Sequence, residues 1–399
     1  MDKINILNKI IESFRLTSFF SNKYPSLMVI ICTLISLFWI GIVNKDGLNN
    51  ISGYNADNYA GFALNIVANK TFSGENADNE QPPSLSMRRA PGYPAFLASI
   101  FFLSNQKQNL DQCINDDNRR SCGVMSNYRM IFQSILFTLC SLTLYFMCIL
   151  FNSSKKISFF IAIICSIILS KELVTTSHSE ALAIPLYILH CFFITRWFIL
   201  PDQKIKNTIL SGFSLGLLIL TRSVYLYHIP FFIILFLALY FLKNRYVYDQ
   251  MKHLIFFCAI VCLTVSPWIG RNYFYFDRID IASSGVVKVL ANRAEHNNMT
   301  NMEYLSGFIY WVPIPKMQKL FQKNFQSESF RRFNINDEYS FRQQGRNKAL
   351  DGIRTLGENE AKKMFMNQIL SKPINNLKMS LLFGWRGLHY VFIFVPFFA

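Results

Sequence analysis

The chain has 399 residues, of which 52% are apolar and only 16% are charged, and its mean hydropathy is +0.24. Soluble domains carry about a quarter charged residues, so this composition excludes an ordinary soluble globular protein. The net charge of +16 does not indicate nucleic-acid binding, because the basic residues lie between apolar segments rather than along one soluble face. We therefore expect membrane lipids, and no nucleic acid, among the partners.

The first apolar run extends from Ser26 to Val43, a length that suits a membrane span. Residues 1–24 before it carry four basic side chains, and basic segments favour the cytoplasmic side. The N-terminal segment is therefore predicted to be cytoplasmic. No small-residue cleavage site follows Val43, so the run is predicted to be a retained anchor rather than a signal peptide.

Six further apolar runs are predicted to span the membrane: Met125–Phe151, Ile157–Thr176, Ala181–Leu200, Ile205–Thr221, Tyr225–Leu242 and Leu254–Pro267. This pattern predicts an all-α polytopic membrane protein. The connections at Lys155-Lys156, Arg196–Lys206 and Lys243–Lys252 are basic and are predicted to be cytoplasmic. Those at Ser177–Glu180 and Arg222–Ser223 contain a single arginine and are predicted to be external.

This alternation requires Met125–Phe151 to enter the membrane from outside. Pro91–Ser104 is therefore predicted to lie along the outer interface as an amphipathic or re-entrant helix, within a first external loop of residues 44–124. The division predicted for the remaining chain is a transmembrane core at 25–268, a second external loop at 269–376 with a helix at Asn359–Leu370, and a C-terminal apolar helix at 377–399, which we expect to be incomplete.

Ionisable residues recur at the outer ends of these segments: Asp57, Arg88, Arg89, Glu180, Arg222 and Arg271. Ionisable groups at membrane depth are costly and are usually functional or paired. Several arginines suit the binding of a lipid phosphate, since guanidinium groups bind phosphate in a bidentate manner. One carboxylate, Asp57, could then act as the general base that takes a proton from an attacking hydroxyl.

Five motifs carry a family resemblance: Asp57 after the first span, Arg-Ala-Pro-Gly-Tyr-Pro at 89–94, Ser-Glu at 179–180, Leu-Thr-Arg at 220–222 and Pro-Trp-Ile-Gly-Arg-Asn at 267–272. In this order the chain resembles the GT-C superfamily of membrane glycosyltransferases. The likeness is to the bacterial branch related to dolichyl-phosphate-mannose protein mannosyltransferases and the lipid A aminoarabinose transferase.

The resemblance implies a helical bundle with two large external loops, a polyprenyl-phosphate-linked sugar as donor, no required cofactor, and an acceptor that is a lipid, a glycan or a protein. It also implies inversion at the anomeric carbon, on the periplasmic face of a bacterial inner membrane. Asp57 matches the family's catalytic carboxylate, Arg89 the arginine before Pro-Gly-Tyr-Pro, and Glu180 the acid of Ser-Glu. Tyr93 joins the candidate substrate contacts. Ser223 stands where the family often has proline.

Simpler interpretations remain open for each signal. Asp57 could cap a helix that starts at Asn58, Arg88 or Arg89 could bind lipid headgroups, and Glu180 could be a structural partner of Arg222 or Arg271. Cys113 and Cys122, if external, could form a disulfide. The sequence has no local metal-binding spacing.

Two other functional classes remain open. A transporter or flippase of an anionic polyprenyl lipid could use the same arginines to line a path. A non-catalytic membrane assembly subunit is the third possibility.

Overall fold

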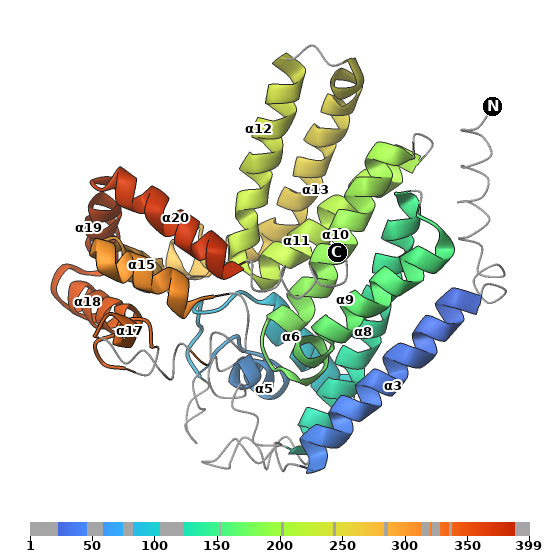
Figure 1. Ribbon diagram of the computed structural model, residues 1–399, viewed down its shortest axis with the longest axis horizontal. Coiled ribbons are helices and arrows are strands. Elements are labelled where there is room, and N and C mark those ends of the chain that lie inside the picture. The colour runs from blue at the N-terminus through green and yellow to red at the C-terminus, as the bar shows by residue number, and fades with distance from the viewer. Residues whose placement is uncertain are drawn as a thin grey trace. The chain divides into compact units, whose positions relative to one another are not determined.

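The computed structural model describes residues 23–45, 59–74, 83–103, 123–151, 153–200, 203–241, 245–282, 286–312, 320, 328–334 and 337–387 (Figure 1). Every regular element in these ranges is a helix. Five segments are long and apolar enough to cross a membrane: Lys23–Val43, Asn127–Leu150, Lys155–Thr175, Glu180–Ile199 and Met251–Phe276. The predicted fold class is confirmed: this is an all-α polytopic membrane protein. The chain forms two compact units, residues 1–283 and 284–399.

The first unit contains the apolar helices. They are α3 (Lys23–Lys45), α5 (Tyr59–Asn69), α6 (Gly92–Leu103), α8 (Gly123–Leu150), α9 (Lys155–Thr175), α10 (Glu180–Ile199), α11 (Lys204–Thr221), the 3-10 helix η3 (Ser223–Tyr227), α12 (His228–Phe241) and α13 (Arg245–Phe276). Large apolar side chains on these helices face outward: Leu34 and Phe38 of α3 are 60% and 61% exposed. Such a surface suits lipid rather than water.

Polar side chains join neighbouring helices inside this apolar unit. The Trp39 indole of α3 donates a hydrogen bond to Ser170 Oγ of α9 over 2.9 Å, and Ser166 of α9 donates to Ser141 Oγ of α8 over 2.7 Å. Hydrogen bonds of this kind, together with close packing, hold helices together where lipid provides little hydrophobic driving force.

Helix α11 packs closely against α13 through two glycines spaced four residues apart. A Cβ atom added to Gly216 would lie 2.5 Å from Thr264 Cβ, and one added to Gly212 would lie 3.0 Å from the Phe257 carbonyl oxygen. Small residues at this spacing let two helix backbones approach each other in a membrane protein. This contact holds the middle of α11 against α13.

Helix α6 has 12 residues. At about 1.5 Å per residue it is roughly 18 Å long, well short of the ~30 Å hydrocarbon core of a bilayer. Tyr93, Leu97 and Ile100 form its buried face against α5, whereas Phe102 is 72% exposed. The length of α6 therefore agrees with the prediction that this stretch is too short to cross the membrane.

Some helix boundaries and lengths differ from those expected. Helix α13 continues past Pro267 to Phe276, although we predicted that the chain would leave the membrane at Trp268. Proline removes one backbone donor, but packed membrane helices tolerate this loss. The two compact units meet after Ser283. The predicted spans Ile205–Thr221 and Tyr225–Leu242 correspond to α11 and α12, helices of 18 and 14 residues that are not among the five long apolar segments.

The second unit consists of shorter, more polar helices. They are α14 (Val286–His296), α15 (Asn301–Tyr310), α17 (Glu328–Arg331), α18 (Phe341–Leu356), α19 (Glu358–Leu370) and α20 (Pro373–Gly387). The helix predicted at Asn359–Leu370 is α19, and α20 begins at Pro373, before the predicted residue 377. Helix α14 packs against α18 where Gly345 leaves no room for a side chain: a Cβ atom would lie 2.7 Å from Asn292 Cα.

Candidate functional site

An ion pair marks the centre of the candidate site in the first unit. Glu180 is the first residue of α10, and Arg222 directly follows the last residue of α11. These two helices pack against each other, so the start of one lies beside the end of the next. The Arg222 guanidinium donates a hydrogen bond to the Glu180 carboxylate. The structure thus brings together two residues that are 42 positions apart in the sequence.

Tyr59, at the start of α5, connects this ion pair to the arginine motif. Its hydroxyl donates to Ser179 Oγ over 3.4 Å, and Ser179 Oγ donates to Glu180 Oε2 over 3.4 Å. The Arg89 guanidinium carbon lies 5.2 Å from the centre of the Tyr59 ring, a cation–π contact. Three of the candidate motifs therefore meet through Tyr59, which the sequence alone does not indicate as a site residue.

Tyr93, in α6, packs against Tyr59. Its ring is fully buried and stands nearly perpendicular to the Tyr59 ring, with 5.2 Å between the centroids and 88° between the planes. Its hydroxyl accepts a hydrogen bond from Gln133 Nε2 over 3.3 Å. The sequence predicts that Tyr93 contacts the substrate, but in the structure Tyr93 packs against Tyr59 and exposes no surface to a ligand.

Gly92 fixes the arginine motif to the end of α11. A Cβ atom at Gly92 would lie 2.5 Å from Thr221 Oγ1 and 2.8 Å from Thr221 Cα. Only glycine therefore permits this contact, and it ties the loop with Arg89 to the helix end with Arg222. The glycine of the Pro-Gly-Tyr-Pro motif has a packing role here.

Arg271 reaches the same loop from α13. Its Nη1 atom donates to the Ser86 carbonyl oxygen over 3.0 Å, and its guanidinium carbon lies 4.6 Å from the centre of the Trp268 ring. Arg88, two residues after Ser86, has an exposed side chain, and its backbone N–H donates to Ser86 Oγ over 3.1 Å. Arg271 thus holds the segment that carries Arg88 and Arg89.

Sequence reasoning missed a buried arginine next to this site. Arg129, in α8, is only 1% exposed. Its guanidinium donates to the carbonyl oxygens of Thr175, over 3.1 Å, and Thr176. It also donates to Gln133 Oε1 over 3.0 Å. It thereby clamps the end of α9, just before Ser179 and Glu180. The signal was present, since an ionisable residue inside a predicted span is seldom accidental.

Two predicted features lie outside the described residues: Asp57, the proposed base, and the cysteines Cys113 and Cys122. Within the described part, no group of three or more His, Cys, Asp or Glu residues could hold a metal ion. Glu172, in α9, interacts electrostatically with Glu180 and is a second carboxylate near the site.

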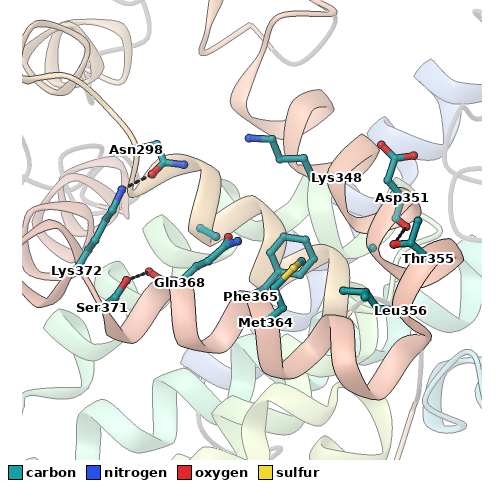
Figure 2. Close-up of a pocket in the computed structure, with 12 residues that line it drawn as sticks. Asn298, Lys348, Asp351, Thr355, Leu356, Met364, Phe365, Gln368, Ser371 and Lys372 are labelled. Carbon is teal, nitrogen blue, oxygen red and sulfur yellow. Dashed lines mark hydrogen bonds between the residues drawn. The ribbon is translucent and has the colours of Figure 1, made fainter.

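A hollow of about 520 Å³ lies among α14, α18 and α19 of the second unit (Figure 2). Its two lysines already have partners: Lys348 donates to Glu295 over 2.6 Å, and Lys372 donates to Asn298 over 2.6 Å, as the dashed line in Figure 2 marks. Phe365 lies at its centre but is only 2% exposed, so its ring offers little surface to a ligand. We assign no ligand to this hollow.

Arg222 pairs with Glu180, and Arg89 is linked to the same carboxylate through Tyr59 and Ser179, so two guanidinium groups lie near one carboxylate, a balance of charge that favours an anionic ligand. No protein-family model matches the chain, and no curated protein or solved structure matches it either. The basis for a functional proposal is therefore the chemistry of these residues.

Proposed function

We propose that the protein is an integral membrane glycosyltransferase of the GT-C type. It would move a sugar from a polyprenyl-phosphate-linked donor to a lipid, glycan or protein acceptor on the periplasmic face of a bacterial inner membrane. The observation that carries this proposal is the connection of Arg89, Glu180 and Arg222, from three separate motifs, through Tyr59 and Ser179.

The arginines have the role of binding the phosphate of the donor. Arg89 and Arg222 flank the Tyr59–Glu180 connection, and both lie at chain positions next to helix ends rather than within the middle of a span. A planar guanidinium can form two parallel hydrogen bonds to phosphate, which a lysine cannot. Glu180 accepts from Arg222 and so orients its guanidinium while the phosphate takes the remaining donors. Arg271 holds the loop from the other side.

Asp57 has the role of the general base. Its carboxylate takes the proton of the acceptor hydroxyl as the hydroxyl oxygen attacks the anomeric carbon of the sugar. The bond between the anomeric carbon and the phosphate oxygen breaks, and polyprenyl phosphate leaves with the electron pair, so the configuration at that carbon inverts. Phosphate is a good leaving group, and the guanidinium groups stabilise its negative charge. The reaction needs no cofactor.

A comparison of cells with and without the protein tests the function. We expect mass analysis of surface glycolipids, polysaccharides and proteins to show one sugar that is missing when the protein is missing. The purified protein in lipid nanodiscs should then transfer this sugar from a labelled polyprenyl-phosphate donor to the acceptor so identified. If the protein in liposomes translocates the lipid donor across the bilayer but transfers no sugar, it is a flippase and our proposal is wrong.

A further inference from the structure

The second unit contains a smaller hollow that differs in chemistry from the one in Figure 2. It has a volume of about 370 Å³, within the roughly 300–1,000 Å³ of small-molecule sites. Helices α14, α18 and α20 contribute to it. Side chains that line it include Arg293, His296, Trp311, Arg332, Arg342 and Phe383.

Two of its arginines are cations without an acidic partner in the described part of the chain. Arg293 donates through Nη2 to the Asn376 carbonyl oxygen over 2.7 Å and to Ser380 Oγ over 3.3 Å, both uncharged groups. Partial burial lowers the pKa of the Arg293 guanidinium from its ordinary value, because the charged form loses contact with water. Arg342 is exposed at the first turn of α18.

Arg332, the third arginine of the hollow, already forms ion pairs with two carboxylates. It donates to Glu295 over 3.3 Å and to Glu303 over 3.2 Å, and its guanidinium carbon lies 4.1 Å from the centre of the Phe341 ring. The hollow therefore keeps two positive charges, on Arg293 and Arg342, available for a ligand.

Aromatic rings form the rest of the wall. The centre of the His296 ring lies 5.0 Å from that of the Phe341 ring and 5.4 Å from that of the Phe383 ring. His296 and Phe383 are partly exposed. The guanidinium carbon of Arg293 lies 5.5 Å from the centre of the Phe383 ring. A cation and an aromatic ring therefore line the same part of the hollow. Aromatic faces beside a few fixed polar groups are the common composition of a small-molecule site.

We propose that this hollow binds an acidic saccharide, a sugar ring that carries a carboxylate or a phosphate. The aromatic side chains of His296 and Phe383 contact the apolar face of the ring, and Arg293 and Arg342 bind the acidic group. This inference rests on the proposed function insofar as the saccharide belongs to the acceptor. Binding itself does not depend on transfer, so the two can fail separately.

The test is a binding titration of the full-length protein in detergent with four probes: methyl β-glucuronide, glucose 6-phosphate, methyl β-glucoside and inorganic phosphate. We expect at least one acidic sugar to bind about tenfold or more tightly than both the neutral glucoside and inorganic phosphate. Arg293→Gln and Arg342→Gln should each weaken that binding about tenfold. Arg346→Gln, an exposed arginine one turn further along α18, is the matched control and should leave binding unchanged.

Arg293 also contacts α20, so Arg342→Gln keeps the test valid if the Arg293 variant does not fold. Equal binding of the acidic and neutral sugars, or no binding of either acidic sugar, would overturn the inference. So would acidic-sugar binding that is unchanged in Arg342→Gln. Inorganic phosphate that binds as tightly as glucose 6-phosphate would overturn the role of the sugar ring. None of these results depends on whether the protein transfers a sugar.

Discussion

The Arg222 guanidinium donates a hydrogen bond to the Glu180 carboxylate, and this ion pair joins the end of α11 to the first residue of α10. The two side chains are 39% and 37% exposed. Pairs this open to solvent contribute on the order of 0–1 kcal/mol to stability. The pair is therefore better suited to orienting Arg222 than to holding the fold together.

Replacing either member of the pair should affect activity more than stability. We expect Glu180→Gln and Arg222→Gln each to change the free energy of unfolding by about 1 kcal/mol or less, with a coupling energy of the same order in the double-mutant cycle. Polyprenyl-phosphate binding should fall about tenfold or more in Arg222→Gln, because a charge-assisted phosphate contact is lost. Unchanged lipid binding in this variant would contradict the role we give Arg222.

A methyl group at Gly92 should disrupt the site through packing alone. Gly92→Ala forces a Cβ atom to 2.5–2.8 Å from Thr221 atoms, including its backbone. Overpacking of this kind costs about 1–3 kcal/mol, and we expect a lower midpoint of thermal unfolding in detergent. Gly41→Ala is the matched control, since an added Cβ at Gly41 meets nothing within 4 Å. Equal stability of the two variants would refute the close contact between α6 and α11.

Removal of the Arg129 guanidinium should cost more stability than any other single change near the site. Arg129→Gln leaves the buried Thr175 carbonyl oxygen without its donor, whereas the Thr176 carbonyl oxygen keeps the hydrogen bond from Gln133 Nε2, and we expect a cost of about 2–4 kcal/mol. Arg129→Lys should recover only part of this, because an ammonium lacks the planar fork. Lys156→Gln, an exposed change at the start of α9, should be neutral in the same unfolding assay. A neutral Arg129→Gln would show that the clamp is not formed.

In the second unit, a buried carboxylate provides a contrast with an exposed one. Glu295 is 6% exposed and accepts from Lys348 and Arg332, so Glu295→Gln leaves two cations with a weaker partner and should cost about 3 kcal/mol. Glu360, in an exposed pair with Lys363, should tolerate Glu360→Gln with a change below about 0.5 kcal/mol. Chemical denaturation followed by circular dichroism compares the two. Equal losses would contradict the charge network around Glu295.

Much of the fold follows from the apolar runs alone, since a bilayer demands long apolar helices. The run Met125–Phe151 corresponds closely to α8, and the shortness of Pro91–Ser104 corresponds to α6. The end of α13 was not predictable from Pro267, because tertiary packing decides whether a proline ends a membrane helix. The division into units after Ser283 depends likewise on contacts between distant segments.

The candidate site was predictable only where charge stood out in an apolar context. Arg89, Glu180, Arg222 and Arg271 are the candidates that this context indicates. Tyr59 and Ser179 were not singled out as connecting groups, because a tyrosine or serine near a helix end is common and only the packing of α5 against α6 and α10 brings them together. The aromatic hollow of the second unit has no sequence motif, since its rings and arginines come from separate helices.

The central claim is that Asp57 is the base of a glycosyl transfer whose phosphate is bound by the arginines. The most direct measurement compares the wild-type protein with Asp57→Asn in nanodiscs, following both transfer of labelled sugar and binding of the polyprenyl-phosphate donor. We predict that Asp57→Asn loses transfer by at least about a hundredfold, the contribution typical of a general base, while donor binding stays within about twofold. Full transfer activity in Asp57→Asn would contradict the account.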